Sequence, residues 1–103
     1  MYIVVFVTTS DRKEADKIAA ALIQKKLAAC VNIVSKIESV YRWQGKIEKS
    51  KESLLIIKSK KNKLAGLIKL VKSLHSYTVP EVIALPIAGG SKTYLNWINE
   101  SLR

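Results

Sequence analysis

The sequence predicts an α+β domain with the ferredoxin-like order βαββαβ, in which two crossover helices cover one face of an antiparallel sheet. Two observations support this class. The apolar residues alternate between a period of two and a period of about 3.6 along the chain, and the changes of period fall at turn-forming residues. The 103 residues are enough for one domain. We therefore expect a single domain over residues 1–103, with a long central β-hairpin and an additional C-terminal helix.

A strand and a helix are expected first. Residues 2–9 form a run of β-branched and other apolar residues, which is typical of a strand. Ser10 or Asp11 then provides an N-cap for the helix that follows. The apolar residues of this helix fall on one stripe, formed by Ala15, Ile18, Ala19, Leu22 and Ile23.

A long strand is expected from Ala29, where the period changes to two. Its even positions include Asn32, Lys36, Glu38 and Arg42, which indicates a strand with one polar side. We expect the odd positions to share the other side; they include Ala29, Val31, Ile33, Ile37, Tyr41 and Trp43.

Residues 44 and 45, Gln-Gly, predict a two-residue hairpin turn, because glycine accepts a positive φ at little cost. Residues 46–60 then return as the next strand. This tight turn would place Glu38 opposite Lys51 and Tyr41 opposite Glu48.

The C-terminal part of the chain predicts a helix, a strand and a last helix. Helical spacing returns at Leu64 and ends near His75, before the break at Pro80. Residues 82–87 predict the fourth strand, and Pro86 places it at an edge or a bulge because proline donates no ladder hydrogen bond. Ser91 can cap the last helix, whose apolar side comprises Tyr94, Leu95, Trp97, Ile98 and Leu102.

The length of the hairpin predicts an oligomer. A strand of about 15 residues spans about 50 Å, whereas a domain of this size has a radius of gyration near 13 Å. The hairpin must therefore bend or overhang the rest of the sheet. Its tip carries Tyr41 and Trp43, whose large amphipathic rings are favoured at protein interfaces. We expect the sheets of neighbouring copies to pack together.

Charge and cysteine content exclude several classes of function. The net charge is +10, but it comes from 15 lysines and only 3 arginines, whereas base-reading sites favour arginine. The expected first and third strands lack the interleaved aromatic residues that stack bases, which also argues against nucleic-acid binding. Cys30 is the single cysteine, so no internal disulfide or CxxC motif exists. Without a membrane-spanning run or leader pattern, we expect a cytoplasmic protein that does not contact membranes.

Four blocks of sequence resemble the CutA family of divalent-cation tolerance proteins, in order and over nearly the whole chain. They are residues 28–33 (AACVNI), 39–47 (SVYRWQGKI), 75–81 (HSYTVPE) and 94–97 (YLNW). The resemblance implies a ferredoxin-like protomer, a homotrimer in which long hairpins wrap neighbouring subunits, and a role in tolerance of copper and other divalent cations. It implies no catalytic activity and no required cofactor.

His75 and Cys30 are the candidate metal ligands, because they are the only imidazole and thiol in the chain. Three symmetry copies would raise the number of ligands at an interface. Each residue also has a simpler interpretation. Cys30 suits packing within a strand, and His75 suits the end of a helix, where an imidazole can bond free carbonyls.

The other candidate residues suit a ligand pocket or the core of a trimer interface, since aromatic rings with few polar groups form the usual apolar cleft. Glu48 and Glu81 are alternatively partners for lysines or ligands for a hard cation. The set comprises Tyr41, Trp43, Glu48, Tyr77, Glu81 and Trp97.

Two broad functions follow from these residues. The first is a homotrimer of the metal response that binds copper, another divalent cation or a small ligand. The second is a signalling or scaffold trimer similar to PII proteins, which hold ligands between subunits. The tight turn at residues 44 and 45 argues against the second function, because it leaves no long effector loop.

Overall fold

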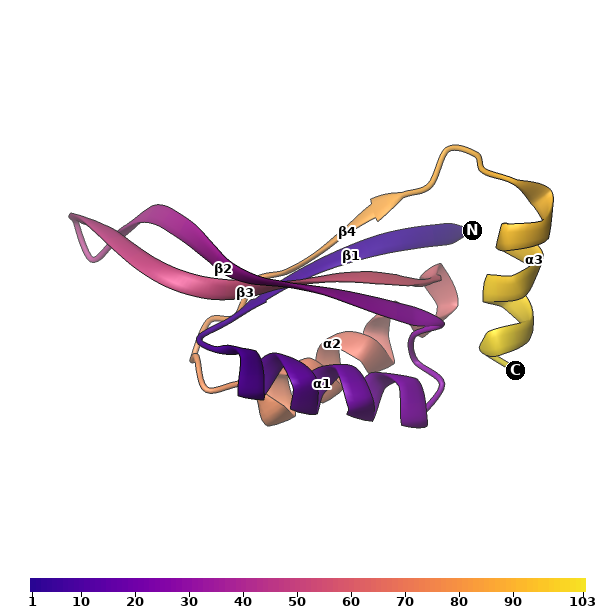
Figure 1. The fold of residues 1–103 in the computed structure, drawn as a ribbon, viewed down its shortest axis with the longest axis horizontal. Helices are drawn as coiled ribbons and strands as arrows, with labels where there is room; N and C mark the ends of the chain where they lie inside the picture. Colours follow the sequence, from indigo (N-terminus) through magenta and orange to yellow (C-terminus); the bar gives the residue numbers. More distant parts are fainter.

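The structure is a computed structural model that describes residues 1–103. Its elements follow the predicted order, with one short 3₁₀ turn added before the second helix (Figure 1). They are β1 (Tyr2–Thr9), α1 (Arg12–Gln24), β2 (Cys30–Trp43), β3 (Lys46–Lys60), the 3₁₀ turn Lys61–Lys63, α2 (Leu64–Leu74), β4 (Val82–Pro86) and α3 (Lys92–Ser101).

The four strands form one antiparallel sheet in the order β2-β3-β1-β4. Helices α1 and α2 lie side by side on one face of the sheet, and α3 lies at the end of the sheet opposite the hairpin tip (Figure 1). The predicted ferredoxin-like class is confirmed. Strand β4 is an edge strand, as Pro86 requires. None of the helices has the length and apolar character needed to span a bilayer.

The hydrophobic core lies between the sheet and the two crossover helices. Alternate residues of β1 and β3 point toward α1 and α2, so their side chains pack against the apolar stripes of the two helices. Burying each such aliphatic side chain contributes roughly 1.5–3 kcal/mol. The cluster comprises Ile3, Val5, Val7, Ala15, Ile18, Leu22, Ala28, Leu55, Ile57, Leu67 and Val71.

The predicted apolar stripes of α1 and α3 are only partly buried in the structure. Ile23 was expected in the core, but it is 44% exposed, because it lies about 100° around the helix from Leu22 and away from the sheet. On α3, Ile98 and the adjoining Leu102 are buried, whereas Trp97 is exposed. The remaining apolar surface of α3 therefore faces outward.

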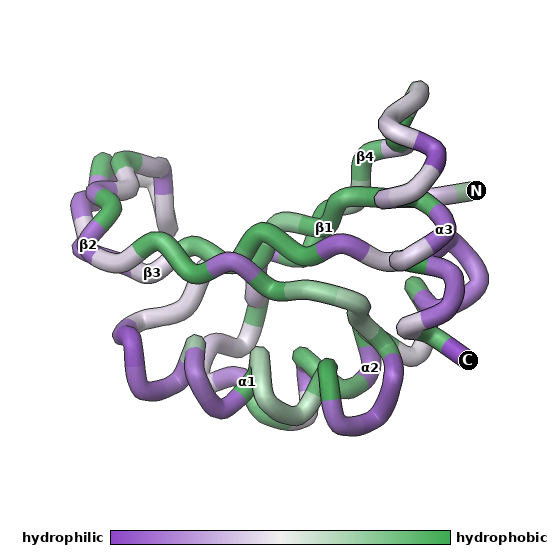
Figure 2. Tube along the Cα trace, turned by 45° about the vertical axis from the view of Figure 1, so that its right-hand side comes forward, coloured by the Kyte–Doolittle hydropathy of each residue, from purple (hydrophilic) through white to green (hydrophobic).

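The other face of the sheet is also apolar, although neither α1 nor α2 covers it. Phe6 at its centre pairs with Ile56 on β3 and Ile83 on β4, and cross-strand partners share a face. Figure 2 shows apolar residues running along these strands, while polar residues lie on the outer sides of the helices. A sheet face that meets water normally carries polar side chains. We call this surface, defined by Phe6, Ile56, Ile83 and Leu85, the open face.

The β2–β3 hairpin overhangs the rest of the sheet, as its length predicts. Strand β1 pairs with β3 only from Ser53 onward, so residues 46–52 pair with β2 alone. The molecule is accordingly elongated, with extents of 44 × 25 × 22 Å. The predicted register of the tight turn is confirmed: Glu38 pairs with Lys51 and Tyr41 pairs with Glu48.

The expectation that all odd positions of β2 share one side is wrong, because a β-bulge interrupts the strand. Val34 pairs with Leu54, but the next pair is Ile37 with Glu52, so two residues of β2 oppose one residue of β3. Lys36 is the residue that takes a positive φ, 61°. A single extra residue moves all following side chains to the opposite face of the strand.

The bulge decides which face the hairpin aromatics join. Val31 and Ile33 pair with core residues of β3 and point toward the helices. Beyond the bulge, Tyr41 and Trp43 pair with even-numbered residues of β3 and share their face with Glu52. The extra residue therefore brings the aromatic tip to the open side of the sheet.

Replacing Lys36 by glycine tests the bulge. Because a side chain disfavours the left-handed conformation, Lys36→Gly should raise the free energy of unfolding by about 0.5–1 kcal/mol. The control Glu38→Gly, in regular strand, should lower it by about the same amount. Urea unfolding at equal chain concentration measures both. A loss of stability in both variants would contradict the bulge.

Candidate functional site

His75 ties the end of α2 to the end of β1. Its side chain is fully buried, and its Nε2–H donates to the Thr8 carbonyl at 2.7 Å. Its Nδ1 accepts the backbone N–H of Tyr77 at 3.0 Å. Because both ring nitrogens are engaged, this arrangement requires the neutral Nε2–H tautomer. The predicted bond from the imidazole to helix carbonyls is replaced by the bond to β1.

Glu14 on α1 holds the same turn from the other side. Its Oε2 accepts the backbone N–H of Ser76 at 3.0 Å, and its Oε1 lies 3.7 Å from His75 Nδ1. The segment after α2 is thus fixed to both β1 and α1. These contacts set the direction in which Tyr77 leaves the turn.

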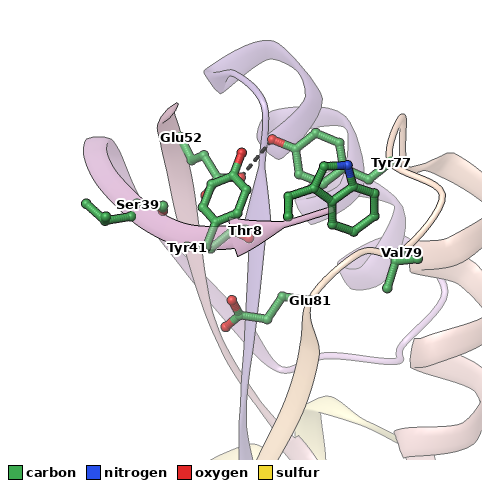
Figure 3. A pocket seen from close by; sticks show the side chains of 9 residues that line it. Thr8, Ser39, Tyr41, Glu52, Tyr77, Val79 and Glu81 are labelled. Atoms are coloured by element: carbon green, nitrogen blue, oxygen red, sulfur yellow. Dashed lines mark hydrogen bonds between the residues drawn. The ribbon is translucent and has the colours of Figure 1, made fainter. Parts of the chain in front are cut away.

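Tyr77 reaches from this turn to β3, where its hydroxyl donates to Glu52 Oε2 at 2.7 Å (Figure 3). Burial, and then the hydrogen bond and charge of Glu52, raise the pKa of the Tyr77 hydroxyl well above its usual range. A tyrosine hydroxyl is protonated at neutral pH even at its ordinary pKa, so it is a donor to the carboxylate, and the raised pKa extends this to alkaline pH. This bond closes one end of a groove.

The groove lies between the overhanging hairpin and residues 77–81, and its volume is about 540 Å³. In Figure 3 the Tyr41 ring extends from the hairpin and the Glu81 carboxylate from the segment that also carries Val79, and a dashed line joins Tyr77 to Glu52. We call this the hairpin groove, and its walls are formed by Thr8, Ser39, Val40, Tyr41, Trp43, Glu52, Tyr77, Val79 and Glu81.

Four of the six predicted pocket residues meet in the hairpin groove: Tyr41, Trp43, Tyr77 and Glu81. Two do not. Glu48 lies opposite Tyr41 on the hairpin but does not line the groove. Trp97 is on α3 at the other end of the sheet, where its ring lies 5.5 Å from that of Tyr94.

Glu52 is the groove residue that sequence reasoning missed. It sits in the polar half of β3, where its residue type suggests a solvent-exposed strand position, yet it is only 7% exposed. Its burial depends on Tyr77, which is distant in sequence, and on the bulge that turns the hairpin. The only available signal was the strand alternation, which places Glu52 on the same face of the strand as Glu48, the expected partner of Tyr41.

The predicted metal ligands are not brought together within one chain. Cys30 pairs with Lys58 on β3, whereas Thr8, which binds His75, pairs with Leu54, about 13 Å along the strand. No group of three or more His, Cys, Asp or Glu side chains converges anywhere in the chain. The residues present therefore do not fit a divalent-metal site within a single chain.

Comparison with known proteins identifies relatives of the chain. A sequence model described as CutA1 divalent ion tolerance protein matches residues 3–101. Protein CutA, chloroplastic, of Arabidopsis thaliana is 54% identical over 101 residues, which are 98% of this chain but 56% of that protein. The divalent-cation tolerance protein CutA of Thermus thermophilus is 47% identical over 98 residues, 95% of each chain.

The same likeness holds in three dimensions. The structure of the periplasmic divalent cation tolerance protein CutA from Archaeoglobus fulgidus superposes with a TM-score of 0.97 and 43% identity, and all of each chain is covered. The chain thus spans a little over half the length of its Arabidopsis relative, but all of the Archaeoglobus one.

Tyr77→Phe tests the bond that closes the groove. It leaves the buried Glu52 carboxylate without its donor, so the free energy of unfolding should fall by about 1–3 kcal/mol. Tyr94→Phe is the matched control, because the Tyr94 hydroxyl makes no hydrogen bond. Equal effects of the two substitutions in urea unfolding would contradict a stabilising Tyr77–Glu52 bond.

Proposed function

The chain belongs to the CutA1 divalent ion tolerance family, and on that premise we propose that it is a non-catalytic homotrimer that binds a small ligand in the hairpin groove. The observation that carries this proposal is the groove itself, where aromatic rings and carboxylates from two distant segments converge. Such concave, mostly apolar sites with a few polar groups are typical of small-molecule binding. Ligand binding would link the protein to divalent-cation tolerance.

The open face supports the homotrimer. Phe6 and Ile56 lie at its centre, and Ile83 is 51% exposed in the single chain. A contiguous apolar surface of this kind marks an interaction site. The overhanging hairpin extends the same surface beyond the core, where it can reach a neighbouring copy. We take three as the number of copies from the family resemblance of the sequence.

The engagement of His75 supports a binding role over catalysis. The only imidazole in the chain uses both nitrogens to position Tyr77, so it offers no free general base to the groove. The relatives are named for cation tolerance and not for a reaction. We assign His75 to positioning.

The hairpin does not support the alternative role as a PII-like signalling protein. The turn at Gln44 and Gly45 is tight, with φ of 50° and 80°, so no long loop is available to contact an effector protein. A small-ligand role needs no such loop. Location in the cytoplasm stays a prediction from the sequence, whereas relatives are named chloroplastic or periplasmic.

Sedimentation equilibrium tests the assembly. The wild-type protein should show three times the 11.5 kDa mass of the chain. Ile83→Lys places a charge on the open face and should shift the mass toward a single chain. Ile23→Lys, on a similarly exposed isoleucine of α1, should leave the trimer intact. A wild-type mass of one chain, or equal behaviour of the two variants, would contradict the proposal.

Calorimetric titration with Cu(II), Zn(II) and Cd(II) tests direct metal binding at His75 and Cys30. Because the imidazole is already engaged, we expect His75→Gln and Cys30→Ser to bind these ions as the wild-type protein does. His75→Ala should instead lower the free energy of unfolding by about 1–3 kcal/mol, since two backbone groups lose their partner. A tenfold or greater loss of metal affinity in both His75 variants would establish a metal site there.

A further inference from the structure

We infer that the hairpin groove binds a small organic ammonium ion, which Glu52 and Glu81 attract and the rings of Tyr41 and Trp43 enclose. The inference rests on the ligand-binding role proposed above and specifies the chemical class of the ligand. Three properties of the groove carry it: its charge, an unpaired buried carboxylate, and its aromatic walls.

The groove is acidic in a strongly basic protein. The chain carries 18 lysines and arginines against 8 acidic residues, yet the groove walls include Glu52 and Glu81 and no basic residue. An acidic cleft with low-dielectric walls concentrates cations and repels anions. Most of the basic residues therefore lie outside the groove, which differs in charge from the rest of the surface. A cation is therefore the ligand that the charge of the groove selects.

Glu52 is a buried charge without a counterion. Its Oε2 accepts a hydrogen bond from the Tyr77 hydroxyl, whereas its Oε1 accepts none from the protein and is open to solvent. Arg12, Lys36 and Lys51 line a neighbouring cavity that shares Glu52, but none of them forms an ion pair with it. A buried carboxylate is costly unless it is paired. A cation bound in the groove would supply the counterion that the protein does not provide.

Tyr77 does not neutralise this charge. Because burial and Glu52 raise the pKa of its hydroxyl, Tyr77 keeps its proton and shares it with the carboxylate only as a hydrogen bond. Tyr77 therefore offers the carboxylate a hydrogen bond but no positive charge. His75 and Glu14 hold the turn that sets this geometry.

The aromatic walls favour an organic cation over a bare metal ion. Tyr41, Trp43 and Tyr77 present rings to the groove, and ring faces attract ammonium groups, especially methylated ones. A hard metal ion favours a compact shell of about six oxygen ligands in which carboxylates neutralise its charge, whereas the groove offers only two carboxylates beside four hydroxyl-bearing side chains. The volume of about 540 Å³ also suits a small molecule.

Titration followed by NMR tests the inference on the assembled protein, with choline and n-butylammonium as probes. The uncharged 3,3-dimethyl-1-butanol has nearly the shape of choline and serves as the control ligand. We expect the indole N–H signal of Trp43 to shift with either ammonium ion, with an affinity at least about tenfold higher than for the alcohol. The Trp97 signal, from the other end of the sheet, should not move.

Two matched variants locate the charge. Glu81→Gln should weaken choline binding about tenfold, whereas Glu48→Gln, the same change on the hairpin outside the groove, should leave it unchanged. Glu81 is exposed and makes no hydrogen bond or ion pair, so its replacement should not disturb the fold.

Each contrary result has a distinct meaning. Equal affinity for the alcohol would overturn the ammonium assignment while the ligand-binding role stands. If Mg²⁺ displaced choline from the groove, the site would belong to a metal ion. If no probe moved the Trp43 signal in a protein that still sediments as a trimer, the groove would not be a ligand site; a side chain from a neighbouring copy filling it would give this result.

Discussion

The structure depends on a sheet that is apolar on both faces while its two crossover helices cover only one. Val5 and Ile57 close the core against α1 and α2, but Phe6 and Ile56, one position away on the same strands, point to the opposite side. Burying that second face requires another protein surface, because the remaining helix, α3, packs at the end of the sheet and does not lie across this face (Figure 1). The long hairpin adds to this uncovered surface, since it extends the open side of the sheet beyond the core.

The groove arises where this constraint meets the β-bulge. The extra residue at Lys36 turns Tyr41 toward the side that carries Glu52, and the turn held by His75 sends Tyr77 to the same place. The site therefore depends on the β-bulge in β2, on the turn after α2 and on the end of β1 to which that turn is bonded. His75 contributes to it by fixing the direction of the backbone at the end of α2.

Much of this was readable from the sequence. The order of elements and the hairpin register followed from local signals: the change of period, the Gln44–Gly45 turn, and Pro86 at an edge. The bulge was not readable, because the alternation continues on both sides of Lys36 and only cross-strand pairing reveals the inserted residue. Glu52 was missed for a related reason, since its burial depends on Tyr77, which is 25 residues away. Trp97 was predicted to line a ligand pocket or a trimer interface, and within the single chain α3 places it at the other end of the sheet from the groove.

A crystal structure of the assembled protein grown with choline tests the central claim most directly. Neighbouring copies should cover Phe6, Ile56 and Ile83, while the hairpin groove should stay open and hold the ammonium group beside Glu52. A structure in which the open face meets solvent, or in which the groove is filled by a neighbour's side chain with no ammonium ion bound, would contradict it.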